Sequence, residues 1–197
     1  MTKGLASIIV RTKNESFWIG KCLHEINNQI YKNYEIIVVD NSSTDQTLRI
    51  VKNNFPKVKI IKYKGKEFFP GKALNLGIKA SKGKFIAMIS GHCIPKNKSW
   101  LSGLITNFKN KSVAGVYGKQ EPLDMSDPND VRDLIYLFGK DKKIQSKDPF
   151  FHNANSMIRR DLWKKIKFDE NIHHIEDRIW AQKKLKKLIK LLVQGII

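Results

Sequence analysis

Cysteine is scarce in this chain, and its sequence has no long apolar run. Only Cys22 and Cys93 occur among 197 residues. Two distant cysteines are too few for a disulfide framework or a zinc site, so we expect a reducing compartment. No apolar run approaches the roughly 20 residues that cross a bilayer, and no signal peptide precedes the first apolar run. These absences predict a cytoplasmic protein.

Acidic residues are also few, and the formal net charge is +19, from 37 Lys and Arg against 18 Asp and Glu. Such a charge favours anionic partners, namely nucleotides, nucleic acid or anionic lipid. The alternative is that lysine simply fills surface positions that carry no function. The sequence has neither an aromatic-rich platform for single strands nor a groove-reading motif, so we do not expect specific nucleic-acid binding.

Two β-branched runs near the N-terminus are the most informative feature that is present. The first, 6–10, breaks into the polar turn 11–15. A helical stretch follows, and the second run, 35–39, ends in the polar segment 40–45. In an open parallel sheet, ligands bind beyond the carboxyl ends of the strands. The pattern therefore predicts that a small polar ligand binds at this edge, with Asp40 as the first contact to suspect.

Strands alternate with helices over most of the chain, which predicts a parallel α/β sheet in a single domain, 1–197. Segment 122–149 is rich in Asp, Pro, Lys and Gly and is interpreted as a mobile, partly helical insert. The expected strands are 7–10, 36–40, 58–62, 84–90, 113–119 and 151–158. The expected helices are 16–29, 43–53, 71–81, 100–108, 160–166 and 179–193.

Several motifs occur in an order that is typical of one enzyme family. They are Ser7–Glu15, Val38–Asp45, Gly71–Gly77, Phe85–Pro95, Asn155–Arg160, Phe168–Glu170 and Glu176–Trp180. Each motif is weak by itself, but the ordered set covers nearly the whole chain and resembles a family 2 glycosyltransferase. The resemblance implies a GT-A fold, in which a Rossmann-like, mostly parallel sheet is flanked by helices.

The resemblance also implies an activity, namely inverting transfer of a sugar from a nucleotide-sugar to a hydroxyl acceptor. It implies a UDP-linked donor and an acceptor that is a glycan or a lipid-linked glycan, as in polysaccharide biosynthesis. The nucleotide-binding half would cover about 1–95 and the acceptor half about 96–197.

By the same resemblance, Asp40 reads the uracil or another pyrimidine-like base. The alternative is structural, with Asp40 capping its turn and Asp45 capping the next helix, and for Asp45 we favour the cap. The other expected donor contacts are Thr12, Asn14, Glu15, Ser42, Ala73, Asn75, Ser90 and Gly91.

The sequence departs from the family pattern after the fourth expected strand. Family members usually carry Asp-x-Asp there, a carboxylate pair that bridges a divalent cation to the diphosphate, whereas this chain has Ser90-Gly91-His92. His92 is therefore the expected metal ligand, and its imidazole suits Mn²⁺ better than Mg²⁺. The alternatives are that a cationic side chain partly replaces the ion, or that His92 is only a hydrogen-bonding loop residue.

The expected catalytic pair is Glu176-Asp177. Inverting transfer needs one base that deprotonates the acceptor hydroxyl. Asp177 matches the family's base, and Glu176 would orient the acceptor. The alternative is an acid pair that complements a helix dipole. The main rival function is a non-catalytic, nucleotide-sugar-binding remnant, because the acidic metal motif is missing.

The C-terminal segment 179–193 has the pattern of an amphipathic helix. Its apolar residues recur at helical spacing, and lysines surround them. This pattern predicts either peripheral contact with the anionic inner face of a membrane or a helix docked on the catalytic core, and we favour the docked helix.

Overall fold

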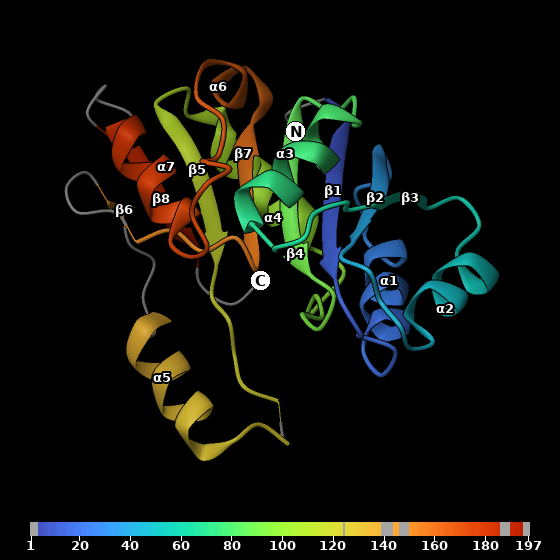
Figure 1. Ribbon diagram of the computed structural model, residues 1–197. Coiled ribbons are helices and arrows are strands. Elements are labelled where there is room, and N and C mark those ends of the chain that lie inside the picture. The colour runs from blue at the N-terminus through green and yellow to red at the C-terminus, as the bar shows by residue number, and fades with distance from the viewer. Residues whose placement is uncertain (1–3, 124, 139–143, 146–149, 186–189, 195–197) are drawn as a thin grey trace.

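The computed structural model describes residues 4–123, 125–138, 144–145, 150–185 and 190–194 (Figure 1). Their strands form an eight-stranded mixed sheet in the order β3-β2-β1-β4-β7-β5-β8-β6. The strands are β1 Ala6–Thr12, β2 Tyr34–Asp40, β3 Lys59–Lys62, β4 Phe85–Ser90, β5 Val113–Gly118, β6 Ile144–Gln145, β7 Asn155–Arg159 and β8 Lys190–Gln194. The helices are α1 Ile19–Asn27, α2 Thr47–Asn54, α3 Pro70–Lys79, α4 Trp100–Thr106, α5 Pro128–Phe138, α6 Arg160–Lys165 and α7 Glu176–Leu185, with a 3-10 turn at Asn107–Lys109.

Most of these strands run in one direction. β1 pairs in parallel with β2 and β4, and β2 pairs in parallel with β3. Because β7 is antiparallel to both β4 and β5, β5 runs in the same direction as β4. The strands β1, β2, β4 and β5 therefore all end at one edge of the sheet, which we call the carboxyl edge, and begin at the opposite edge, the amino edge.

Two apolar layers cover the sheet, because successive strand residues point to opposite faces. Ile8 and Val10 of β1 belong to a core that includes Trp100 of α4 and the buried side of α1. Ile9, between them, belongs to a second core that includes Trp180 of α7 and the buried sides of α3 and α6. Helices on both faces confirm the expected α/β fold.

The second expected helix begins later in the chain than its sequence suggested. The pattern predicted a start at Ser43, but α2 begins at Thr47. Residues 41–46 instead form a turn, since Ser42 adopts a left-handed backbone (φ 56°) and Ser43 bonds back to Asp40. Local hydrogen bonds from such side chains compete with the first helical turn.

The expected C-terminal helix is wrong at its end. α7 is described to Leu185, residues 186–189 of the expected helix lie outside the described residues, and Lys190–Gln194 forms β8, which pairs in parallel with β5 and is antiparallel to β6. Lys184, expected on the charged face, is buried and donates a hydrogen bond to the carbonyl of Leu162 (2.8 Å). Pairing with neighbouring strands outweighs the local helical pattern, and the amphipathic membrane-facing helix does not form as expected.

One smaller difference concerns the second half of the chain. The strand expected from Phe151 begins only at Asn155, because residues 153 and 154 form a turn against the start of α7. The expected insert contains α5, which extends away from the sheet in Figure 1. Within the described residues, no helix is both long and apolar enough to cross a membrane.

Candidate functional site

The carboxyl edge brings the ends of β1, β2 and β4 into direct contact. The amide of Asn41 donates to the carbonyl of Thr12 (2.9 Å), and the amide of Gly91 donates to the carbonyl of Arg11 (2.8 Å). A Cβ atom at Gly91 would lie 3.0 Å from Thr12 Oγ1 and 3.3 Å from Glu15 Cγ. Glycine therefore permits a close approach of three expected donor residues, Thr12, Glu15 and Gly91.

Asp40 closes the turn that follows β2. Its carboxylate is 1% exposed and accepts hydrogen bonds from both the amide (3.1 Å) and the hydroxyl of Ser43. A buried carboxylate with two donors already in place is a fixed acceptor rather than a mobile one. The turn-capping alternative for Asp40 is thus present in the structure, and each carboxylate oxygen retains a further lone pair.

Asp45 makes hydrogen bonds that match the capping role favoured for it. Its carboxylate accepts from the amide of Thr47, the first residue of α2 (2.9 Å), and from the amide of Ser16 (3.0 Å). Desolvation acts to raise its pKa, but hydrogen bonds from Thr47 and Ser16 outweigh this effect and lower the pKa to about 2. Asp45 therefore connects the turn after β1 to the start of α2.

Asn14 is held in a left-handed backbone conformation beside this turn. Its φ is 55°, a conformation that asparagine tolerates better than most residues. The Asn14 side-chain oxygen accepts from the amide of Thr44 (2.8 Å), and the Asn14 amide donates to Ser43 Oγ (2.9 Å). The turns after β1 and β2 therefore brace each other, and Ser42 is part of the second of them.

His92, the expected metal ligand, is paired with an acid. Its Nδ1 lies 2.7 Å from Glu15 Oε1. A hydrogen bond with Cys93, together with the hydrogen bond and charge of Glu15, raises the pKa of His92 to about 9 against the opposing effect of burial. The imidazole is therefore protonated at neutral pH. Among the described residues, no group of three or more His, Cys, Asp or Glu side chains could hold a metal ion.

Arg11 connects the end of β1 to the start of α7. Its guanidinium Nη1 lies 3.7 Å from Glu176 Oε1, and that carboxylate also accepts from Asn153 Nδ2 (3.2 Å). Burial raises the pKa of Glu176, as does the neighbouring Asp177, while Arg11 and Asn153 act in the opposite direction. Burial lowers the pKa of Arg11, against the raising effect of both acids. A buried carboxylate is thus kept beside a half-buried cation.

Asp177 lies at the first turn of α7, half-buried and fixed by the backbone. Its Oδ2 accepts from the amide of Asn153 (3.1 Å), and its Oδ1 accepts from the amide of Arg178 (2.7 Å). The residue before the acid pair, Ile175, has φ 60°, which is costly for a β-branched side chain. The surrounding contacts hold this strained turn and with it the orientation of the acid pair.

His152 lies close enough to Asp177 for the two charges to interact. Burial lowers the pKa of His152, while Asp177 acts to raise it. The Nδ1 of His152 lies 2.8 Å from the side-chain nitrogen of Gln120. His152 therefore extends the polar cluster from Asp177 toward the loop after β5.

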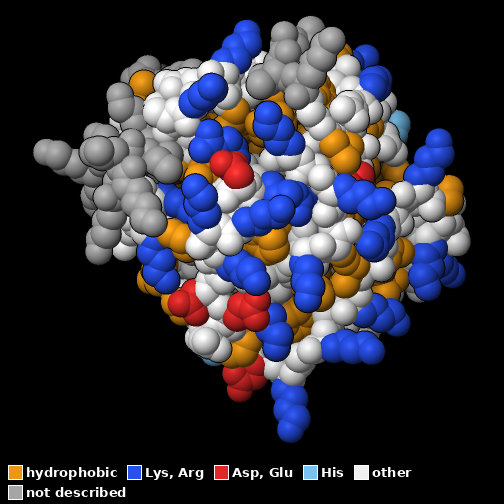
Figure 2. Space-filling model, turned by 90° about the horizontal axis from the view of Figure 1, so that it is seen from above, with side chains coloured by type: hydrophobic (Ala, Val, Ile, Leu, Met, Phe, Trp, Pro, Cys, Tyr) orange, Lys and Arg blue, Asp and Glu red, His pale blue; other side chains and the backbone are white. Residues whose placement is uncertain are grey.

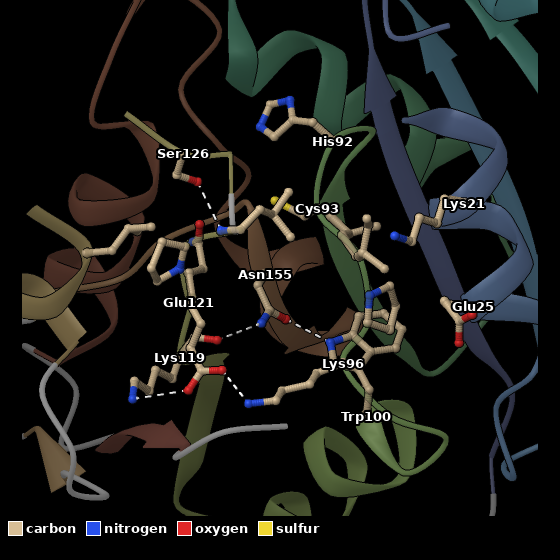
Figure 3. A pocket seen from close by; sticks show the side chains of 17 residues that line it. Lys21, Glu25, His92, Cys93, Lys96, Trp100, Lys119, Glu121, Ser126 and Asn155 are labelled. Carbon is tan, nitrogen blue, oxygen red and sulfur yellow. Dashed lines mark hydrogen bonds and ion pairs between the residues drawn. The ribbon is translucent and has the colours of Figure 1, made fainter. Parts of the chain in front are cut away.

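A pocket of about 570 Å³ adjoins this cluster (Figure 3). His92 and Gln120 are among its lining residues, so it borders both the end of β4 and the loop after β5. Glu121 pairs there with Lys119 (3.3 Å) and Lys96, and Trp100 Nε1 donates to Asn155 Oδ1 (2.8 Å). The walls combine charged, amide and apolar side chains.

Two expected donor contacts have other surroundings. Ala73 lies on the buried side of α3, is 1% exposed and belongs to the core. Asn75 accepts from Trp163 Nε1 (2.8 Å) and donates to the carbonyl of Phe168 and to Glu170 (both 2.9 Å). Since the Asn75 side chain already bonds to these protein groups, we leave its amide out of the donor site.

The sequence did not single out Arg11 or Asn153 as site residues. Arg11 Nε and Thr12 Oγ1 are buried and find no hydrogen-bond partner among the described residues. Buried polar atoms without partners are unusual, and these two belong to the last two residues of β1, at the carboxyl edge. The sequence did offer one signal for Arg11, because a charged residue is unusual as the sixth residue of an apolar strand.

A mixed sheet covered by helices on both faces, with acids and polar turns at its carboxyl edge, defines a GT-A glycosyltransferase fold. The model of glycosyl transferase family 2 matches residues 7–167, and the chain belongs to this family.

Curated relatives are longer than this chain. One is the dolichyl N-acetyl-alpha-D-glucosaminyl phosphate 3-beta-D-2,3-diacetamido-2,3-dideoxy-beta-D-glucuronosyltransferase of Methanococcus voltae, 33% identical over 163 residues, which cover 75% of this chain and 50% of the relative. Another is the O-antigen chain rhamnosyltransferase WbaN of Salmonella anatum, 25% identical over 198 residues, which cover 94% of this chain and 62% of the relative. The chain thus spans between half and two thirds of the length of these proteins.

Solved structures share the fold. The mannosyltransferase PcManGT from Pyrobaculum calidifontis, in complex with GDP-Man and Mn²⁺, superposes with a TM-score of 0.76 at 19% identity, over 100% of this chain and 58% of that one. TarS of S. aureus, in complex with UDP-GlcNAc, superposes with a TM-score of 0.75 at 22% identity, over 96% of this chain and 56% of that one. At such identities the likeness concerns the fold.

Proposed function

We propose that this chain transfers a sugar from a nucleotide-sugar, UDP-linked, to a hydroxyl of a glycan or lipid-linked glycan, with inversion. The observation that carries the proposal is the contact between Arg11 and Glu176 (3.7 Å), because it joins the end of β1 to the acid pair of α7. A donor bound over the strand ends would therefore lie beside a carboxylate base. Membership of family 2 supports the same activity.

The donor half of the site is formed by the turns after β1, β2 and β4, within about residues 1–95. Asp40 would accept hydrogen bonds from the N–H of the base, and Asn14, Glu15 and Ser42 lie in the adjoining turns. The buried Thr12 Oγ1 and Arg11 Nε lack partners among the described residues and are available to the donor. Ser90 and Gly91 would contact it at the end of β4, where a glycine allows close approach.

The catalytic step requires one base, and we assign it to Asp177. The acceptor hydroxyl gives its proton to the carboxylate as its oxygen attacks the anomeric carbon. The bond from that carbon to the diphosphate breaks as the new bond forms on the opposite face, so the configuration inverts. Hydrogen bonds from the amides of Asn153 and Arg178 hold Asp177 in one orientation. Glu176 is fixed by Arg11 and Asn153, and would orient the acceptor.

A divalent cation has weak support from the residues present. His92 and Glu15 offer one nitrogen and one carboxylate, and cations of this kind often combine one or two protein ligands with substrate phosphates. The cation would neutralise charge on the leaving diphosphate. Because imidazole suits Mn²⁺ better than Mg²⁺, we expect Mn²⁺ to support donor binding better than Mg²⁺. Either ion must displace the proton of His92. Equal donor affinity in EDTA, Mg²⁺ and Mn²⁺ would remove the cation from the proposal.

A remnant that binds nucleotide-sugars without transferring them is the second candidate. It is favoured by the serine and histidine, Ser90 and His92, that stand where the family carries acids, and by the absence of a three-ligand cluster among the described residues. A thermal-shift panel of UDP- and GDP-sugars, followed by a transfer assay with each donor that binds, separates the two candidates. Binding without turnover on any acceptor supports the remnant.

A further inference from the structure

The amino edge of the sheet carries a dense concentration of positive charge. We define the amino-edge face as residues 28–35, 55–59, 79–84, 107–113 and 159–161, which connect helices and strands at that edge. Figure 2, seen from above Figure 1, shows lysine and arginine side chains over much of this side. The cationic residues of the amino-edge face are Lys32, Lys57, Lys59, Lys79, Lys82, Lys84, Lys109, Lys111, Arg159 and Arg160.

The two acids of this face are already engaged. Glu35 accepts hydrogen bonds from Ser7 Oγ (2.6 Å) and from the amides of Lys82 (2.5 Å) and Gly83 (3.2 Å). Asp161 pairs with Arg159 (3.4 Å). The eight lysines of the face are all exposed, so their charge reaches the solvent with little compensation from nearby acids.

The carboxyl edge differs in its balance of charge. Its turns carry acids among their lysines, and Glu121 pairs with both Lys96 and Lys119. The lysines are Lys13, Lys64, Lys66, Lys96 and Lys119, and the acids are Glu15, Asp45, Glu67 and Glu121. If lysines only filled surface positions that carry no function, the two edges would have a similar balance of charge. The excess of cations over acids at the amino edge therefore points to a partner for that edge, and the donor site at the other edge does not account for it.

We propose that the amino-edge face binds the surface of an anionic lipid bilayer. Charge complementarity is the argument, because anionic headgroups attract lysines spread over a broad face. Arg159 and Arg160 donate to the backbone carbonyls of Lys111 and Gly83, and Lys59 donates to the carbonyl of Ala80 (3.1 Å). The remaining exposed charge comes from lysines, which act as point charges without bidentate geometry. Such a face responds to charge density rather than to one shaped ligand.

Nucleic acid fits this face less well. Single strands are held by aromatic side chains on which bases stack. The exposed aromatic residues of the described chain, Phe17, Phe68 and Tyr136, follow β1 and β3 or lie on α5, outside the amino-edge face. Without exposed aromatic anchors there, binding to a bilayer would be electrostatic and sensitive to salt.

This orientation would also constrain the acceptor, a consequence that rests on the proposed function. β1 has seven residues and spans about 23 Å. With the amino edge on the bilayer, the acid pair of α7 would face away from it at about that height or more. The site would then reach the outer end of a membrane-linked glycan rather than its lipid-proximal sugar.

The chain offers a closely matched pair of variants for the test. Lys82-Gly83-Lys84 lies at the amino edge, and the same tripeptide, Lys64-Gly65-Lys66, lies at the carboxyl edge. Co-sedimentation of the full chain with phosphatidylglycerol-containing vesicles, at about 0.15 M salt, measures binding. We expect pelleting with these vesicles and none with pure phosphatidylcholine. Lys82→Glu/Lys84→Glu should weaken vesicle binding at least about 20-fold, from about fivefold per lysine, and more than Lys64→Glu/Lys66→Glu does.

Several outcomes would overturn the inference. They are equal losses of vesicle binding in the two double variants, equal pelleting with anionic and with pure phosphatidylcholine vesicles, and no pelleting with either. A loss of duplex DNA binding in Lys82→Glu/Lys84→Glu, with vesicle binding intact, would instead assign the face to nucleic acid. Circular dichroism checks each fold, and Lys82→Gln/Lys84→Gln serves if the charge reversal prevents folding. Donor binding is not part of this readout, so failure here leaves the proposed function standing.

Discussion

Single carboxylates at the carboxyl edge have more than one possible partner. Asp40 closes a turn with Ser43 and yet retains lone pairs for a ligand. Glu176 is buried and held by Arg11 and Asn153. Folding has therefore already removed water from these side chains and fixed their orientation. A ligand can then bind them with little further loss of conformational entropy.

The first prediction concerns the role of Asp40 in reading the base. Asp40→Asn keeps the size of the side chain but removes its charge, so we expect UDP binding to weaken by about 1–3 kcal/mol, the scale of hydrogen bonds to charged groups. Isothermal titration calorimetry measures the change. Asp45→Asn, which makes the same substitution at the helix cap, is the control and should bind UDP nearly as well. Unchanged affinity in folded Asp40→Asn rejects the assignment.

The second prediction concerns stability in acid. The pKa of Asp45 is lowered to about 2 by hydrogen bonds from Thr47 and Ser16, so the folded protein favours the ionised form. Its contribution is complete above the unfolded value near 4 and is lost as the pH falls toward 2. At neutral pH we expect Asp45→Asn to cost about 1 kcal/mol, and the difference from the parent to shrink in acid. Urea denaturation at several pH values measures it, and a difference that does not change with pH would contradict stabilisation by the ionised carboxylate.

At the residue scale, sequence reasoning identified acids better than their partners. Asp40 stands out because it ends an apolar strand, while Glu176 and Asp177 were selected through the resemblance to family 2 glycosyltransferases. Arg11 does not stand out in a chain with 37 lysines and arginines. Its role follows from its distance to Glu176, which depends on how α7 folds back against β1. Such long-range contacts leave no local pattern.

Elements of the N-terminal half follow their sequence closely, while the C-terminal end does not. Buried parallel strands such as β1 and β4 are continuous β-branched or apolar runs, and these are easily recognised. The stretch that becomes β8 has helical spacing of apolar residues, and only pairing with β5 decides its conformation. The start of α2 shifted because side chains of the preceding turn compete with the helix.

The third prediction concerns the attachment of α3 to the segment after α6. Asn75 bonds to Trp163 and to the backbone of Phe168. Asn75→Ala leaves buried groups without partners and should destabilise the fold by about 2–3 kcal/mol. Asn53→Ala, an exposed position on α2, should change stability by less than about 0.5 kcal/mol. Chemical denaturation measures both, and equal small effects would mean that this connection contributes little.

At the scale of the whole molecule, the sheet separates two kinds of surface. Its carboxyl edge carries acids, polar turns and Thr12 Oγ1, which has no partner within the described part of the chain, while its amino edge carries exposed lysines with few acids. The fold itself was predictable, because alternating strands and helices specify a sheet with a polar carboxyl edge. The division of charge between edges was not, since it requires knowing which turns meet at each edge.

The measurement that tests the central claim most directly is the turnover of Asp177→Asn. This change keeps the shape of the side chain and removes its basicity, and a base acts mainly in the transition state. With a nucleotide-sugar that binds the parent chain, we predict unchanged donor affinity by calorimetry. We also predict a fall in transfer of about 10²–10⁴-fold, with a product of the parent chain whose anomeric configuration is inverted by NMR. Full turnover in the folded variant, or retention of configuration in the product, would contradict the assignment of Asp177 as the base of an inverting transfer.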